Sequence, residues 1–329
     1  MNRSQLHTYR QLNSKLLAIL FVLLACSQLW GADKPRVLFL TQSKGFMHGS
    51  VRRPEGQRAP AELAMMQLAK DTSEFSVVCT QNAEADITKE NLQKFDIVAF
   101  YTTGKLPISD DNLKYFLGEW LHQKGHGFMG FHSATDTFKD YEPYWDMVGG
   151  SFSGHPWGSN TTVIMKVHDL THPTMKPFGG YSFQFKDEIY QYKNWQPEKV
   201  HLLMSLDMSE TNLKRPYHVP VAWCKEIGDG KMFYNNMGHR EDTWQNERFL
   251  ESITMAVRWI SGKEEGNGKP NPEVSAAHEA HSKKYAELAG QSQERIDAEK
   301  KAKAERNAAR RAAKAAKKAK QEAEAAAAN

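Results

Sequence analysis

The feature that most limits the possible folds is an alternation of short apolar segments with amphipathic stretches between residues 36 and 131. Four apolar segments have the length of buried strands, namely residues 37–42, 75–80, 96–101 and 125–131. Helical spacing of apolar residues occurs between them, at residues 61–70, 88–94 and 112–123. Four strand–helix units in succession predict an α/β fold, with a mainly parallel sheet, right-handed crossovers and flanking helices.

The second half of the chain has more strand signals and fewer helices. Its strand-like runs are residues 161–167, 200–206, 219–227 and 231–237. A stretch rich in Pro, Gly and aromatic residues connects residues 167 and 200, and such a long irregular connection favours a binding loop or a small excursion from the sheet. Residues 247–260 have helical periodicity and are expected to cover the sheet and close the domain.

Residues 1–27 have the pattern of a secretory signal peptide. Arg3, Arg10 and Lys15 precede an apolar run at residues 16–25, which is too short to span a bilayer. We therefore expect export to the periplasm or cell envelope, with a mature chain that begins after Cys26 or Ser27. Residues 23–26 also resemble a bacterial lipobox, so a lipid on Cys26 that anchors the protein to a membrane is an alternative. A retained, uncleaved anchor is the third.

The composition changes after Gly262, which sets the expected domain at residues 34–262. Residues 263–329 form a polar linker and a run rich in Ala, Lys, Arg and Glu, in which Ile296 is the only large aliphatic residue after Leu288. Without an apolar seam this tail is expected to be a solvated, partly helical arm, and its removal from Lys263 is expected to leave the fold intact. A tether to a polyanion or to the cell envelope is the alternative.

The basic residues are concentrated at the two ends of the chain. The formal net charge of +4 therefore conceals a mildly acidic middle part, which argues against nucleic-acid binding. Beyond the signal segment the chain has two cysteines, Cys79 and Cys224, each within an apolar strand-like run. We expect two buried thiols rather than a disulfide, although export would permit a bridge.

Several histidines directly follow the expected strands. His48 follows the first strand, His132 follows the fourth, and His239 follows the last. Because the carboxyl ends of parallel strands meet at one edge of a sheet, we expect these three side chains to share one pocket there. Imidazole is a common metal ligand, so His48 and His132 are candidate ligands for zinc or manganese. A site without any cofactor is the alternative.

Carboxylates and aromatic residues complete the candidate site. The candidate catalytic residues are His132, His239, Asp187 and Glu188, and the candidate substrate-binding residues are His48, Asp136, His155 and Trp157. No tight metal motif such as HExxH occurs, so the indication comes from position alone. For each residue a structural role is the alternative: His155 and His172 precede prolines and could shape loops, and Trp157 could pack in the core.

The ordered series of short motifs resembles the trehalose-utilisation (ThuA-like) domain family. The motifs are residues 45–50, 130–138, 149–156, 171–173, 187–190, 219–223 and 238–239, so the resemblance covers about residues 34–262. This family is similar in fold to the class I glutamine amidotransferases. The resemblance thus implies a flavodoxin-like, doubly wound sheet and a role in carbohydrate metabolism.

The resemblance also implies what this chain does not do. In class I amidotransferases a nucleophilic Cys occupies the sharp turn after a central strand, and a later His-x-Glu completes the triad. Here His132 occupies the turn, while His239 and Glu241 keep the His-x-Glu spacing. Imidazole cannot replace a thiolate in acyl transfer from glutamine, so glutaminase activity is not expected. Ser133, one residue past the turn, is the alternative nucleophile for a Ser–His–Glu triad.

These observations predict an exported protein that acts on a carbohydrate, either a glycoside or an oxidised sugar, as a hydrolase or lyase. The ligand would be a small molecule or an oligosaccharide. The competing interpretation is a non-catalytic carbohydrate-binding or envelope scaffold protein. A catalytic site would show clustered ionisable groups in one cleft, whereas a scaffold would show an aromatic platform without them.

Overall fold

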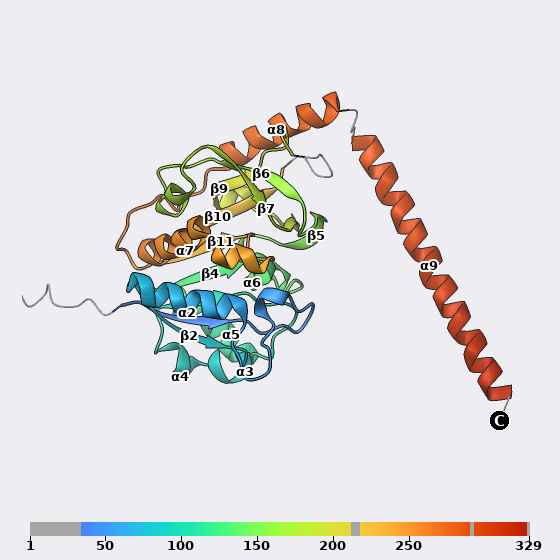
Figure 1. Ribbon diagram of the computed structural model, residues 1–329, viewed down its shortest axis with the longest axis horizontal. Helices are drawn as coiled ribbons and strands as arrows, with labels where there is room; N and C mark the ends of the chain where they lie inside the picture. Colours follow the sequence, from blue (N-terminus) through green and yellow to red (C-terminus); the bar gives the residue numbers. More distant parts are fainter. Residues whose placement is uncertain (1–33, 212–217, 290–292, 328–329) are drawn as a thin grey trace, which may run out of the picture.

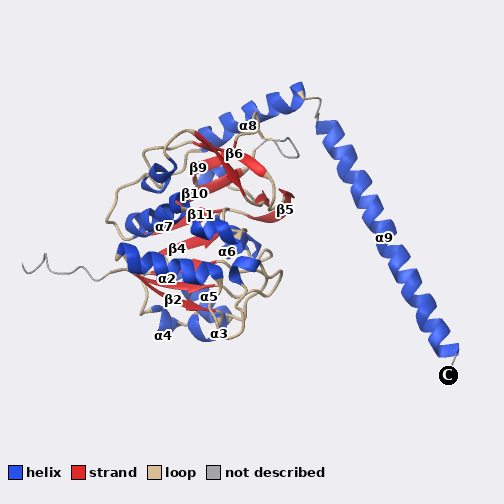
Figure 2. Cartoon of the chain, in the orientation of Figure 1, coloured by secondary structure: helices blue, strands red, loops and turns tan. Residues whose placement is uncertain are grey.

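The computed structural model describes residues 34–211, 218–289 and 293–327, and the predicted signal segment with Cys26 lies outside them. A nine-stranded sheet forms the centre, in the order β2-β1-β3-β4-β11-β10-β9-β6-β7, with helices on both faces (Figures 1 and 2). The fold-class prediction of a flavodoxin-like α/β domain is confirmed.

The first five strands in this order are parallel. They are β2 (Ser76–Thr80), β1 (Arg36–Leu40), β3 (Ile97–Phe100), β4 (Gly127–Phe131) and β11 (Gly230–Asn235). Their carboxyl ends therefore lie at one edge of the sheet. Loops from widely separated parts of the sequence meet at that edge.

The remaining strands extend the sheet in antiparallel fashion. They are β10 (Pro220–Ile227), β9 (His201–Leu206), β6 (Thr162–Val167) and β7 (Ser182–Lys186). The irregular stretch between residues 167 and 200 holds β7 and also β8 (Ile189–Lys193), which pairs with β5 (Ser151–Trp157) in a separate two-stranded sheet. The β7–β8 junction carries the Asp187–Glu188 pair to the edge described above.

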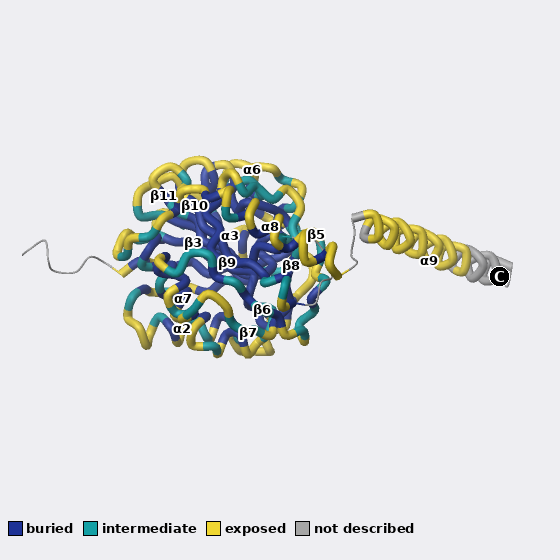
Figure 3. The backbone as a smooth tube through the Cα atoms, turned by 90° about the horizontal axis from the view of Figure 1, so that it is seen from above, coloured by how far each residue is buried: buried dark blue, intermediate teal, exposed yellow. Residues whose placement is uncertain are grey.

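Two apolar cores lie on the two faces of the sheet. One includes residues of α2 (Pro60–Thr72) and α7 (Glu247–Ile260), such as Met65 and Ile253. The other includes residues from the opposite face, contributed by α4 (Lys89–Leu92), α5 (Asp110–Tyr115) with the π-helical turn Phe116–Trp120, and α6 (Glu142–Val148). The buried interior is continuous along the sheet (Figure 3). Cys79 and Cys224 are buried free thiols, as predicted.

The described chain after Gly262 has two parts, of which the first contacts the domain. The prediction that the whole tail is a solvated arm is therefore wrong. The segment leading into α8 (Pro272–Leu288) packs on the sheet: Asn271 Oδ1 accepts a hydrogen bond from Leu202 N at 2.7 Å, and His278 Nε2 lies 3.1 Å from Ser205 Oγ. These interactions are polar, so a search for apolar periodicity misses them.

The last helix, α9 (Gln293–Ala327), differs from α8. Its described side chains are exposed (yellow in Figure 3). None of the helices within the described parts of the chain combines the length and the apolar character that crossing a membrane requires.

Candidate functional site

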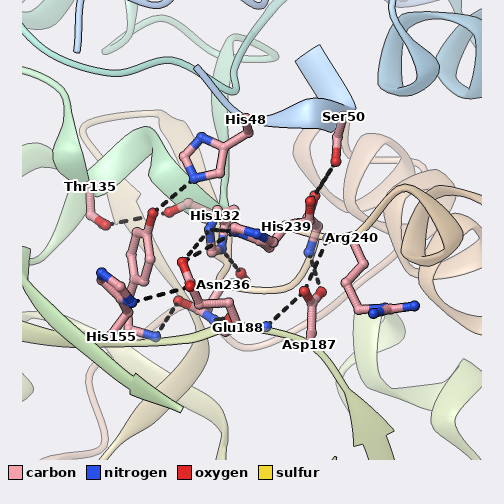
Figure 4. A network of polar contacts seen from close by, with 12 residues as sticks. His48, Ser50, His132, Thr135, His155, Asp187, Glu188, Asn236, His239 and Arg240 are labelled. Carbon is pink, nitrogen blue, oxygen red and sulfur yellow. Dashed lines mark hydrogen bonds and ion pairs between the residues drawn. The ribbon is translucent and has the colours of Figure 1, made fainter. Parts of the chain in front are cut away.

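Three histidines and one glutamate converge at the carboxyl edge of the parallel strands (Figure 4). His48 follows β1, His132 follows β4, His239 follows β11, and Glu188 lies between β7 and β8. Each offers one ligand atom, and these four atoms all lie within 4.8 Å of one another. The ring centroid of His48 lies 4.9 Å from that of His132 and 5.0 Å from that of His239. The predicted convergence of the three imidazoles at this edge is confirmed.

His132 is fully buried and held in one orientation. Its backbone has φ = 41°, in the left-handed region that few non-glycine residues adopt, which turns the chain sharply at the end of β4. Its Nδ1 lies 2.7 Å from the carbonyl oxygen of Asn236. A carbonyl can only accept, so Nδ1 carries the proton, and in the neutral ring Nε2 is left with a free lone pair. Nε2 of His132 faces Nδ1 of His239, and the two nitrogens are 3.2 Å apart.

Glu188 links the histidines from the other side of the cluster. Its Oε1 lies 3.2 Å from His239 Nδ1 and 3.7 Å from His132 Nε2, and its Oε2 lies 3.2 Å from His155 Nδ1. Burial alone would raise the pKa of Glu188, but the adjacent imidazoles of His239 and His132 outweigh it and hold the pKa well below its usual range. Glu188 is therefore a carboxylate at neutral pH.

His48 closes the cluster and is neutral. Its Nε2 lies 3.3 Å from the hydroxyl of Tyr190, and its buried Nδ1 has no hydrogen-bond partner. Burial, together with repulsion from His132 and His239, lowers the pKa of His48 to about 2. A neutral imidazole is the form of histidine that binds a metal ion.

Asp187 is not part of the cluster, although it is adjacent to Glu188. Its carboxylate accepts hydrogen bonds from the backbone nitrogens of Glu188, Gly238 and Arg240 and from the hydroxyl of Thr243, at 2.8 to 3.2 Å. Burial raises the pKa of Asp187. All four donors belong to the loops that carry Glu188 and His239, so Asp187 positions these two residues.

The other predicted site residues have varied environments. His155 contacts Glu188 and is about half exposed, with 55% of its side chain accessible, so it lies at the solvent side of the cluster. Asp136 pairs instead with Lys139 at 2.6 Å. Trp157 is fully buried in the core and is therefore not accessible to a substrate, contrary to its prediction as a substrate-binding residue.

The alternative nucleophile and two further histidines lie outside the cluster. Ser133 Oγ is buried without a hydrogen-bond partner, so the Ser–His–Glu triad is not formed. His172 contacts Thr174 and Cys224, and His218 contacts His278. Both are therefore structural residues of the antiparallel half.

Two residues that position the cluster, Asn236 and Tyr190, were not among the predicted site residues. The backbone carbonyl of Asn236 accepts a hydrogen bond from His132, and the side chain of Asn236 donates one to the carbonyl of Glu188 at 3.0 Å. The ring of Tyr190 packs 4.2 Å from that of His132. The available signal was their place: Asn236 ends a strand-like run, and Tyr190 lies two residues after Glu188.

The donor set fits a divalent transition metal. Zinc in proteins binds imidazole nitrogens and carboxylate oxygens at about 2.0 Å, which puts neighbouring ligand atoms about 3.3 Å apart. The separations of 3.2, 3.2 and 3.7 Å among His132, His239 and Glu188 are close to that value. The bond from His132 Nδ1 to a carbonyl is also the usual second contact of a metal-binding histidine.

Comparisons with known proteins agree on the fold. A family model described as trehalose utilisation (ThuA) matches residues 36–260. A ThuA-like protein from Bacteroides uniformis has 19% sequence identity and a TM-score of 0.55, with 74% of this chain and 98% of that chain covered. One from Parabacteroides merdae has 13% identity and a TM-score of 0.58, with 73% and 96% covered. A search of curated proteins found no match.

Proposed function

Because this chain belongs to the trehalose utilisation (ThuA) family, we propose that it is an exported enzyme that acts on a carbohydrate at a divalent metal centre. The ligands are His48, His132, His239 and Glu188. The substrate is a glycoside or an oxidised sugar, and the reaction is a hydrolysis or an elimination. The family description supports a carbohydrate as the substrate. The basic residues followed by an apolar run in residues 1–27 support export of the protein.

The observation that carries the proposal is the convergence of four ligand atoms within 4.8 Å. The buried imidazoles of His48 and His132 and the partly buried imidazole of His239 surround the carboxylate of Glu188. Imidazole nitrogens and carboxylate oxygens gathered in this way are the ordinary ligands of zinc in proteins. The ionisable groups are clustered, which favours the enzyme over the non-catalytic scaffold.

A bound metal ion would act as a Lewis acid that polarises an oxygen of the sugar. The residues of this chain would do the rest. His155 is the candidate proton donor or acceptor, since it is solvent-accessible and touches Glu188, whereas His239 is occupied as a ligand. Asp187 and Asn236 hold the ligands in place through the loops that carry them.

The experiment that tests this proposal is a calorimetric titration of the metal-free protein with zinc and with manganese. His132→Ala removes one ligand nitrogen and should weaken binding by at least about 100-fold, since even removal of residues that merely support a ligand costs 10- to 100-fold. His122→Ala is the matched control, because His122 is an exposed histidine outside the cluster. Circular dichroism of the metal-free variants checks that both remain folded, because His132→Ala also removes the hydrogen bond to the carbonyl of Asn236.

Activity is then assayed on a panel of disaccharides and their oxidised forms, before and after treatment with a chelator. Metal-dependent turnover that His155→Gln reduces, without loss of metal binding, supports the proposal. Equal metal affinity of His132→Ala and the wild type would contradict the metal centre. Turnover that survives complete removal of the metal would contradict its catalytic role.

A further inference from the structure

In the middle of α9, between residues 300 and 317, the basic side chains are concentrated on one side of the helix. Residues 300–317 contain eight Lys or Arg residues and a single acid, Glu305, and their side chains are exposed. Successive residues of an α-helix are rotated by about 100°, so all of the cations except Lys301 fall within an arc of about 140°. This basic face comprises Lys300, Lys303, Arg306, Arg310, Arg311, Lys314 and Lys317.

The opposite side of the same segment is formed almost entirely by alanine. All eight alanines between residues 302 and 316 lie outside the arc of the basic face, together with Lys301 and Glu305. Near the start of α9, Asp297 lies 3.6 Å from Lys300 and partly neutralises it. From Lys303 to Lys317, over about 21 Å of helix, the basic face has no acid on its own side.

We propose that the basic face of α9 is a docking surface for a membrane rich in anionic phospholipids, on which the helix lies flat. The charge complementarity is direct, because a row of cations on one side of a rod matches a flat negative surface. The alanine side has no large apolar residue to insert between lipid tails, so the attachment is electrostatic and reversible. It does not require a lipid on Cys26.

Because the cations lie on one side of α9, the helix is better suited to a flat anionic surface than to a nucleic acid. A helix in a DNA groove has phosphates on both flanks and uses cations on both. The basic face covers less than half of the circumference, and the domain that precedes it is mildly acidic. The export pattern of residues 1–27 also leads to the cell envelope rather than to nucleic acid.

The test measures sedimentation of the chain from Lys34 to Asn329 with vesicles of phosphatidylcholine, with and without phosphatidylglycerol. This chain retains every interaction of the described fold and lacks the apolar run of residues 16–25, which would bind lipid by itself. We expect binding only to the vesicles that contain phosphatidylglycerol, and its loss in 0.5 M salt, where the Debye length is only about 4 Å.

Charge reversal locates the surface. The triple variant Arg306→Glu, Arg310→Glu, Lys314→Glu should lower the affinity for anionic vesicles by more than about 100-fold, since one basic residue near such a surface is worth about fivefold. Glu favours helix about as well as Lys and Arg, so α9 should persist, which circular dichroism checks. A control with the same net charge is Lys70→Glu, Lys94→Glu, Lys124→Glu, which alters exposed lysines of the domain.

The proposal is overturned if the two triple variants lose affinity equally, because the effect would then reflect net charge alone. It is also overturned if the wild type binds both kinds of vesicle alike, or if it binds duplex DNA more tightly than anionic vesicles at the same salt concentration. Metal binding should be unchanged in both variants. The outcome is therefore independent of the proposed catalytic function.

Discussion

The segment from Lys263 to the end of α8 should contribute a large part of the stability of the domain, and two truncations can measure its contribution. One variant ends at Gly262 and loses residues 263–329. The other ends at Ala289, keeps α8 and loses only the chain that contains α9. The first removes partners of buried groups of the sheet, whereas the second removes none that the structure describes.

The expected loss in the free energy of unfolding follows from the hydrogen bonds that truncation at Gly262 removes. Trp259 Nε1 donates to the carbonyl of Gly266 at 3.0 Å, and His201 Nδ1 bonds the carbonyl of Lys269 at 2.8 Å. The side chain of Asn271 makes two bonds to the backbone of Leu202, and His278 bonds Ser205. These five of the lost hydrogen bonds, at about 1 kcal/mol each, already amount to about 5 kcal/mol, comparable with the whole stability of a small domain.

Thermal melts followed by circular dichroism give the answer. At about 2 to 4 °C per kcal/mol for a domain of this size, the variant that ends at Gly262 should melt about 10 to 20 °C lower or fail to fold. The variant that ends at Ala289 should melt within about 2 °C of the full chain. Equal melting temperatures for all three proteins would refute the reasoning and restore the solvated-linker interpretation.

Two further predictions concern other parts of the molecule. Ser133→Ala should leave turnover unchanged within about twofold, because Ser133 Oγ contacts no base; loss of activity would revive the triad. His218 is a second test: burial lowers its pKa to about 3, so the unfolded chain takes up its proton below about pH 6.5 while the folded chain does not. The free energy of unfolding, measured with urea, should therefore fall between pH 7 and pH 5 by up to about 2 kcal/mol more in the wild type than in His218→Gln. Equal losses in the two proteins would contradict this.

The sequence by itself was sufficient for the parallel half of the sheet and for the place of the site. Apolar runs and helical periodicity depend on burial of one face, which is a local pattern, so β1, β3, β4 and α7 could all be predicted. His48, His132 and His239 follow strands whose ends must meet at one edge, so their convergence also follows from the order of the elements.

Only the tertiary structure decided which neighbouring residues belong to the site. Asp187 and Glu188 are adjacent, yet one carboxylate is bound by four donors of nearby loops and the other faces the histidines. Trp157, two residues after His155, is in the core although its strand reaches the site. The docking of α8 depends on polar interactions such as that of Asn271 with Leu202, which leave no apolar period in the sequence. Side-chain direction and polar partners arise from interactions between residues far apart in the chain, and no local pattern records them.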